Sequence, residues 1–251
     1  MLISPMLVKE VISPPEDYAN VITELKLDGI RLIYSNLNGE IKLFTKHNQD
    51  VTHLFPEILE VQLPKGIVLD GELIAPDREC KPNYDLLMNR LKSKQVLTDV
   101  AIQYVAFDIL YYKGKRVTQL PLLKRKTLLD QTIPTDDITV VTSQWVEGNS
   151  QMYFDIVKEY GLEGIVVKKP MSKYQMGMRS SDWVKIINYK YVKEKKTSSQ
   201  GSAWLLDQKK RQTFFVINVQ AKKNRKILYN QYRQVLKKRK SKCNSHELSD
   251  Y

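Results

Sequence analysis

Lys26 is the first residue whose type and surroundings could do chemistry. It lies in the stretch TELKLDGIRLIYS, residues 23–35, where apolar and polar residues alternate as in a half-buried strand. Asp28-Gly29 follows and predicts a turn, so the amine at the strand end could point into a groove. A deprotonated lysine amine is a nucleophile, and nearby positive charge or desolvation lowers its pKa. Taken alone, the pattern Lys-x-Asp-Gly is more typical of a surface lysine beside a turn, because patterns of four residues occur by chance.

Other cationic residues fall on strands that could surround Lys26 in one sheet. They are Arg31, Lys46, Lys168, Arg179 and Lys185. The sequence contains neither a GxxxxGK[ST] phosphate loop nor a GxGxxG fingerprint. A nucleotide would therefore have to be bound without either of those backbone cradles.

Strand-like segments dominate the first 187 residues. Asn38-Gly39 predicts a hairpin turn between two of them, Asp70-Gly71 interrupts another, and KGK ends the longest in a turn. The predicted strands cover residues 21–35, 40–46, 66–76, 101–118, 164–170 and 182–187. Helical spacing predicts helices over residues 85–93, 121–131 and 149–161, the last ending at Gly161. This pattern predicts a mixed, mostly antiparallel α+β domain.

Composition places the chain among soluble globular proteins. Of its 251 residues, 42% are hydrophobic and 27% charged, and no apolar run is long enough for a membrane helix. The first residues lack the pattern of a signal peptide. Two cysteines and three scattered histidines predict neither a disulfide framework nor a zinc site. We expect a cytoplasmic monomer with no membrane partner.

Positive charge is concentrated in the last quarter of the chain. From Asn188 onward there are 17 basic and 4 acidic residues, 17 − 4 = +13. This balance exceeds the net charge of the whole chain, which is +12. Such a region suits a polyanion such as nucleic acid, although a solvated lysine-rich tail has the same composition. We predict a linker over residues 188–202, and a strand at 213–219 within a basic region over residues 203–251.

Five segments in order resemble the motifs of covalent nucleotidyltransferases, and the small bacterial and phage ATP-dependent DNA ligases most of all. They are KLDGIR (26–31), LDGELI (69–74), YVAFDIL (104–110), EGIVVKK (163–169) and WVKI (183–186). The resemblance covers residues 1–187, including the opening SPML and the later PLLKRK. It implies a two-sheet nucleotidyltransferase (adenylation) domain over this range.

The resemblance also implies a role for Lys26, which would attack the α-phosphorus of ATP and form a lysine–AMP phosphoramidate. Glu163 would help to hold Mg²⁺, a cation that prefers hard oxygen ligands. Glu72 would bind the ribose hydroxyls and contribute to the metal site. Without the resemblance, both glutamates are also typical of a solvent-facing strand or loop.

The remaining implied roles concern the nucleotide. The backbone around Glu24 and Leu25 would read the adenine edge, and Phe107, otherwise an ordinary core aromatic, would stack on the base. Phosphate or nucleotide contacts would come from cations that could otherwise be plain surface charges. These are Arg31, Lys46, Lys168, Arg179 and Lys185.

Three features depart from the family pattern. TKHN places Lys46 where an arginine is usual, which keeps the charge but loses the planar fork. Ile187 stands where the fifth motif usually has a second lysine. Beyond residue 187 only 64 residues remain, without an Arg-x-Asp-Lys-like motif, for the usual C-terminal OB-fold. We therefore expect a truncated or altered OB-fold.

The function that the resemblance implies is an ATP-dependent DNA ligase that seals nicks in duplex DNA, with ATP as co-substrate and Mg²⁺. After adenylation, AMP would pass to a 5′-phosphate at the nick, and the 3′-hydroxyl would then displace it. An RNA ligase or a capping-type enzyme is the alternative within the same class. A protein that binds nucleotide or DNA without sealing nicks is the alternative outside it.

Overall fold

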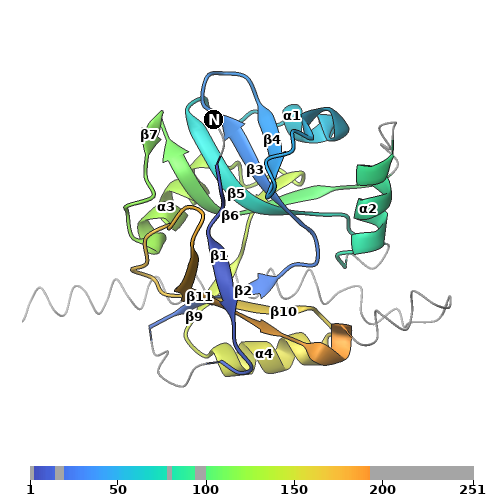
Figure 1. Ribbon diagram of the computed structural model, residues 1–251, viewed down its shortest axis with the longest axis vertical. Helices are drawn as coiled ribbons and strands as arrows, with labels where there is room; N and C mark the ends of the chain where they lie inside the picture. Colours follow the sequence, from blue (N-terminus) through green and yellow to red (C-terminus); the bar gives the residue numbers. More distant parts are fainter. Residues whose placement is uncertain (1–2, 15–19, 78–80, 94–99, 193–251) are drawn as a thin grey trace, which may run out of the picture.

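Two β-sheets form the framework of the protein in the computed structural model, which describes residues 3–14, 20–77, 81–93 and 100–192 (Figure 1). Sheet A has five strands, in the spatial order β1 (Leu7–Glu10), β11 (Arg179–Ile187), β10 (Gly164–Lys168), β2 (Ile22–Lys26) and β9 (Trp145–Glu147). Sheet B has six, in the order β4 (Lys42–Thr45), β3 (Ile30–Asn36), β5 (Ile67–Ile74), β6 (Gln103–Tyr112) and β7 (Lys115–Arg116), with β8 (Val140–Thr142) beside β6. Among these pairs only β1–β11 and β6–β8 are parallel. The predicted mostly antiparallel, two-sheet architecture is confirmed for these residues.

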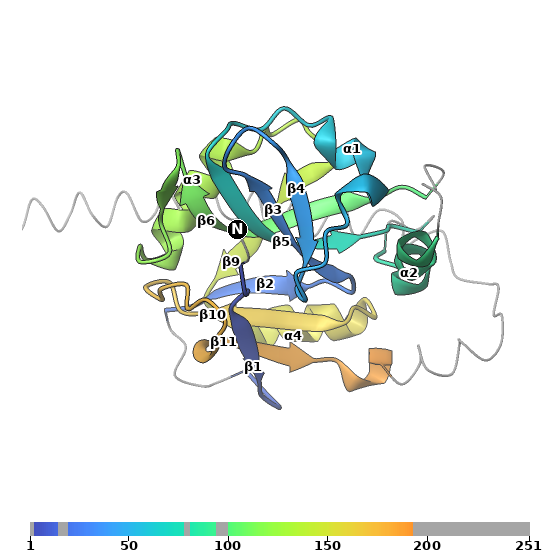
Figure 2. The ribbon, with the colours of Figure 1, turned by 45° about the horizontal axis from the view of Figure 1, so that its top comes forward.

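Helices cover the outer faces of both sheets. The structure has α1 (Pro56–Leu59), preceded by the short 3₁₀ helix η1 (Thr52–Leu54), α2 (Tyr84–Lys92), α3 (Leu122–Thr132) and α4 (Ser150–Glu159). α4 lies along sheet A and packs on β10 and β2, whereas α3 packs on β6 of sheet B (Figure 2). The three predicted helices are confirmed to within two residues at each end. The single turn of α1 is too short to show helical periodicity.

The predicted strand over residues 21–35 is wrong as one element, because it is two strands in different sheets. β2 belongs to sheet A and β3 to sheet B, and residues 27–29 cross between them. Gly29 makes this crossing possible, since a Cβ atom there would lie 2.2 Å from the carbonyl oxygen of Leu73. The alternation of apolar residues continues through the crossing and hides it.

Asp70-Gly71 does not interrupt its strand, contrary to the prediction. β5 runs through both residues, and its register against β6 shifts between them as in a β-bulge. A Cβ atom on Gly71 would lie 2.6 Å from the Tyr104 ring, so glycine lets the ring pack against the backbone. The predicted hairpin turns are confirmed at Gly39, which has φ +86°, and at Lys113-Gly114, where φ is +50° and +75°.

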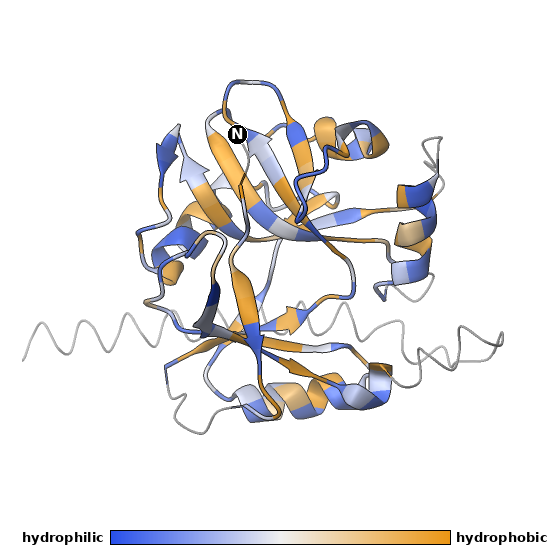
Figure 3. Ribbon diagram, viewed as in Figure 1, coloured by the Kyte–Doolittle hydropathy of each residue, from blue (hydrophilic) through white to orange (hydrophobic). Residues whose placement is uncertain are grey.

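Three hydrophobic clusters follow from this arrangement. One fills the space between sheet B and its helices, one lies under α4 on sheet A, and one lies between the two sheets. The inter-sheet cluster includes Ile22, Ile33, Val68, Leu110 and Trp183, all 1% exposed or less. Hydrophobic and hydrophilic residues alternate along α4, as expected of a helix with one buried face (Figure 3). Both sheets, in contrast, have a hydrophobic cluster on each face.

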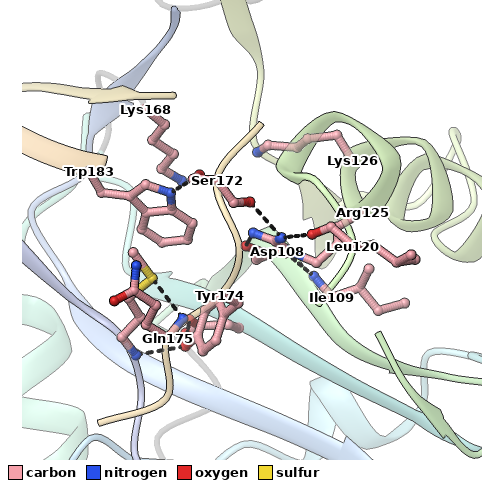
Figure 4. A network of polar contacts seen from close by, with 12 residues as sticks. Asp108, Ile109, Leu120, Arg125, Lys126, Lys168, Ser172, Tyr174, Gln175 and Trp183 are labelled. Carbon is pink, nitrogen blue, oxygen red and sulfur yellow. Dashed lines mark hydrogen bonds and ion pairs between the residues drawn. The ribbon is translucent and has the colours of Figure 1, made fainter. Parts of the chain in front are cut away.

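A fully buried ion pair joins sheet B to the loop between β10 and β11 (Figure 4). Arg125 of α3 donates to both carboxylate oxygens of Asp108 on β6, at 2.7 and 2.9 Å. The same guanidinium donates to the carbonyl oxygens of Leu120 and Ser172, at 2.5 and 3.0 Å. Ser172 in turn accepts the indole N–H of Trp183 on β11 at 3.1 Å. A planar, five-donor side chain thus ties elements of both sheets together.

The C-terminal predictions fall largely outside the described residues. Of the predicted linker over 188–202, only residues 188–192 are described, and residues 189–192 form one helical turn. The basic region over 203–251, its strand at 213–219 and the altered OB-fold all lie outside. Within the described ranges, no helix is both long and apolar enough to span a membrane.

Replacing Asp108 by asparagine should destabilise the fold strongly, by about 3–5 kcal/mol, because it leaves the Arg125 guanidinium buried without a countercharge. Asp155→Asn is the matched control, because Asp155 pairs with Lys158 on the exposed face of α4. Urea unfolding followed by circular dichroism measures both free energies of unfolding. Similar losses in the two variants would contradict the proposed weight of the buried pair.

Candidate active site

The candidate site is a pocket between the two sheets at the end of β2. Its empty volume, including open solvent at the mouth, is about 590 Å³. Residues from both sheets line it: Val8, Glu24, Leu25, Lys26, Leu27, Arg31, Glu72, Phe107, Ser143, Val166, Lys168 and Trp183. Seven of the residues predicted from the sequence are therefore brought to one pocket. Sequence reasoning missed Val8, Leu27, Ser143, Val166 and Trp183, although Trp183 stands in the quoted WVKI segment.

Lys26 and Glu163 form an ion pair at this pocket, with 2.6 Å between Lys26 Nζ and a Glu163 carboxylate oxygen. The sheet register explains the pair, because Lys26 at the end of β2 lies opposite Gly164, the first residue of β10. Glu163 immediately precedes that glycine. The two side chains are 24% and 16% exposed. Lys26 lines the pocket, and Glu163 lies beside it, outside the lining residues.

Glu72 reaches the same place from sheet B, where it lies opposite Arg31. Burial raises the pKa of its carboxyl to about 7, with Glu163 and Asp70 acting in the same direction and Arg31 and Lys26 against it. Two carboxylates from opposite sheets thus face Lys26 without enough positive charge to keep both fully ionised. This donor set fits Mg²⁺, which binds proteins through one or two carboxylates and substrate phosphates. Among the described residues, no three or more acidic, histidine or cysteine side chains are grouped so that they could hold a metal ion by themselves.

Glu24 lies on the pocket floor, buried between two lysines. Lys168 Nζ is 2.7 Å from one carboxylate oxygen, and Lys126 of α3 contacts the other. Ser143 donates a further hydrogen bond at 3.3 Å. Burial opposes ionisation, but the two ammonium groups outweigh it and lower the pKa of Glu24. The PLLKRK segment contains Lys126, but nothing in the sequence pairs it with Glu24.

Lys168, which we predict to join a phosphate-binding surface, lines the pocket from β10. It is buried, and its ammonium lies 4.5 Å from the ring centroid of Phe107 and 4.3 Å from that of Trp183. Burial lowers the pKa of Lys168 to about 8, although Glu24 opposes this. Side chains alternate along β10, so it is the next residue, Lys169, that faces outward.

Phe107 and Arg31 form the sheet B side of the pocket. Phe107 is half-buried, with the Arg31 guanidinium 4.6 Å from its ring centroid. Arg31 donates to both oxygens of the buried Asp70 at 2.5 Å and to the Met6 carbonyl at 3.1 Å. The Asp70 carboxylate therefore holds the guanidinium of Arg31 beside the ring of Phe107, which lines the pocket.

The other predicted cations lie outside the pocket lining. Lys185 lies opposite Val166, on the pocket side of sheet A, and pairs with Glu10 at 2.8 Å. Arg179 is exposed at the start of β11 and donates to the Val8 carbonyl at 2.5 Å. Lys46 is exposed in the turn after β4. Arg179 begins β11 and Lys46 follows β4, whereas Lys185 lies within β11, between β1 and β10. Sequence alone does not identify the partners of these long side chains.

Ile187, the departure from the fifth motif, occupies a specific place in sheet A. It lies opposite Gly164, which in turn lies opposite Lys26. Directly opposed residues point to the same face of a sheet, so position 187 belongs to the same cross-strand row as the candidate nucleophile. A lysine there would add a second cation to this row, and isoleucine does not.

Comparison with known proteins decides the family. The family model "ATP dependent DNA ligase domain" matches residues 5–186. The chain belongs to this family. The resemblance seen in the sequence is thereby confirmed, and with it ATP as co-substrate and Mg²⁺ as the metal that this family uses.

Several ligase proteins are similar to this ligase-domain chain. It is 42% identical over 192 residues to the SPbeta prophage-derived DNA ligase-like protein LigB of Bacillus subtilis, covering 76% of the chain and 70% of LigB. It is 30% identical to a probable DNA ligase of Dictyoglomus turgidum, over 65% of the chain but only 30% of that relative. The ligase domain of M. tuberculosis LigD has 25% identity and a TM-score of 0.61, covering 73% of the chain and 58% of that structure.

A glutamine at position 72 should change how stability depends on pH. The raised pKa means that the folded protein holds a proton on Glu72 that the unfolded chain releases near pH 4.5. Binding of this proton stabilises the folded state relative to the unfolded chain. The contribution is complete below pH 4.5 and is lost as pH rises through about 7. Glu72→Gln stays neutral, so it should exceed wild type in unfolding free energy by about 1–3 kcal/mol at pH 8 and match it near pH 4.5.

Chemical denaturation of both proteins across this pH range measures the difference. Glu60→Gln, at an exposed position, is the control for general charge effects. A difference between Glu72→Gln and wild type that does not change with pH would contradict the assignment.

Proposed function

We propose that this protein is an ATP-dependent DNA ligase that works through a covalent lysine–AMP intermediate. The observation that carries the proposal is the Lys26–Glu163 ion pair at the mouth of a pocket that also contains Phe107 and Glu72. A nucleophilic amine, two carboxylates and an aromatic face are the groups that transfer of an adenylyl group requires. Family membership and the named DNA ligase relatives support the same activity.

In the proposed first step, Lys26 Nζ attacks the α-phosphorus of ATP. A nitrogen–phosphorus bond forms, the bond between the α-phosphorus and the oxygen that bridges it to the β-phosphorus breaks, and pyrophosphate leaves. Glu163, 2.6 Å from Nζ, holds the ammonium at the strand end and places a carboxylate within reach of its proton. Mg²⁺, held by Glu163 and Glu72 with phosphate oxygens, would neutralise the charge that develops on the phosphate.

The nucleotide would lie along the rest of the pocket. Phe107 offers a face for the base, and the backbone of Glu24 and Leu25 forms the adjoining wall. Lys185, once released from Glu10, lies on the same side of sheet A and would contact phosphate. Lys46 and Arg179 are proposed to contact phosphate or nucleotide from the rim. Arg31 contributes indirectly, because Asp70 holds its guanidinium beside Phe107.

The later steps use a nick in duplex DNA. A 5′-phosphate oxygen attacks the phosphorus of lysine–AMP, which restores the Lys26 amine and leaves AMP on the DNA end. The 3′-hydroxyl then attacks the 5′-phosphate, forms the phosphodiester and releases AMP. We propose that the adenylation domain spans residues 1–187 and that the basic residues from 188 onward contact DNA. The monomeric state and the cytoplasmic location stay predictions from the sequence.

Incubation with α-labelled ATP and Mg²⁺ should attach label to the wild-type protein and not to Lys26→Ala. The alanine variant has no amine at the strand end to form the nitrogen–phosphorus bond. Lys158→Ala is the matched control, because Lys158 is an exposed, ion-paired lysine on α4. Denaturing gel electrophoresis measures the label. A wild-type protein that stays unlabelled would favour the non-catalytic, nucleotide-binding alternative.

The choice of nucleic acid is tested with the labelled protein. We expect AMP to pass to a nicked DNA duplex and the nick to be sealed, because relatives of this chain are named as DNA ligases or DNA ligase-like. Product analysis on a sequencing gel distinguishes adenylated from sealed strands. A matched nicked RNA duplex is the comparison, and transfer to RNA alone would overturn the DNA assignment.

A further inference from the structure

Residues 188–192, which the sequence predicts as part of a linker, are bound to the domain. They follow β11 directly, and Asn188 is only 4% exposed. The Val192 amide donates to the Asn188 carbonyl at 3.3 Å and closes a helical turn. We call these five residues the 188–192 turn. Its side chains contact three segments that carry residues of the candidate site.

The first contact is with the segment that carries Glu163. The Asn188 amide N–H donates to the Glu163 carbonyl oxygen at 2.8 Å. The Asn188 side-chain amide donates to the Leu162 carbonyl oxygen at 2.9 Å in a buried hydrogen bond. Two hydrogen bonds from one residue thus fix the backbone just before β10, where the Glu163 side chain begins.

The second contact is with the crossing that carries Lys26. The Tyr191 hydroxyl donates to a carboxylate oxygen of Asp28 at 2.9 Å, across 163 residues of sequence. Asp28 lies in the three-residue crossing between β2 and β3, immediately after the strand that ends at Lys26. Burial and the Asp28 charge both raise the pKa of the Tyr191 hydroxyl, so it remains a donor.

The third contact is with the strand that carries Lys185. The Tyr189 hydroxyl donates to one carboxylate oxygen of Glu10 at 2.7 Å, and Lys185 pairs with the other at 2.8 Å. Glu10 therefore connects the 188–192 turn to the pocket side of sheet A. Unlike Tyr191, Tyr189 is 58% exposed, so this contact is the most open to water of the three.

We infer that Tyr191 is a positioning residue for Lys26, because its hydrogen bond anchors the crossing at the end of β2. The inference rests on the proposed adenylation activity. Lys26 is the last residue of its strand, and strand ends have few backbone restraints beyond the ladder. Asn188 fixes the Glu163 side and Tyr191 fixes the Lys26 side, so one turn sets the relative position of both groups. In-line attack depends on such placement, and errors of about 1 Å are costly in rate.

Removal of the Tyr191 hydroxyl is the direct test. In the full-length protein, Tyr191→Phe keeps the ring and loses only the hydrogen bond to Asp28. We expect the single-turnover rate of lysine–AMP formation at saturating Mg²⁺ and ATP to fall about 3- to 10-fold, the range that loss of one such hydrogen bond implies. The dissociation constant for ATP should stay within about 2-fold of wild type, because base and ribose contacts lie elsewhere in the pocket.

Tyr112→Phe, which removes a hydroxyl near the β6–β7 hairpin, is the matched control and should leave rate and affinity unchanged. A Tyr191→Phe rate within about 2-fold of wild type would overturn the inference. A parallel loss of rate and ATP affinity would also overturn it, since that result indicates general loosening of the domain. Failure of the proposed function looks different, because the wild-type protein itself would then carry no AMP.

Discussion

The proposed chemistry of this protein depends on one interaction, the ion pair between Lys26 and Glu163. It requires β2 and β10 to be neighbours in a defined register, with Lys26 opposite Gly164. A one-residue slip would turn the lysine to the other face of sheet A. The chain also leaves β2 at Lys26 and crosses to sheet B, where β5 carries Glu72 to the same pocket. Gly29 permits that crossing, because Leu73 leaves no space for a side chain.

Charges in the interior are arranged in pairs that keep the pocket in shape. Arg125 with Asp108, and Arg31 with Asp70, are bidentate pairs within sheet B and its helix α3, whereas Glu24 of sheet A is shared by two lysines. Burial of single charges is costly, so these pairs restrict the relative placement of the strands that carry them. Glu72 differs, because its pKa of about 7 reflects a carboxylate with insufficient positive charge around it. A divalent cation with a nucleotide would supply that charge.

Much of the fold and part of the site could be predicted from the sequence. Local signals, such as Asn38-Gly39, KGK and Gly161, identified real turns and a real helix end, because each depends on backbone conformation at one or two residues. The break in the run over residues 21–35 could not be seen, since alternation does not reveal which sheet a strand joins. Long cations were harder still. Lys168 and Lys185 have partners fixed by strand order, and Tyr191 of the 188–192 turn donates to Asp28, 163 positions away in the sequence.

The central claim is that AMP is attached to Lys26 beside Glu163, and peptide mapping tests it most directly. Full-length protein incubated with ATP and Mg²⁺ would be digested and its peptides analysed by mass spectrometry with fragmentation. We predict that AMP is found on the peptide that contains Lys26 and on its side chain. AMP on Lys168, Lys185 or another lysine, with Lys26 unmodified, would contradict the account.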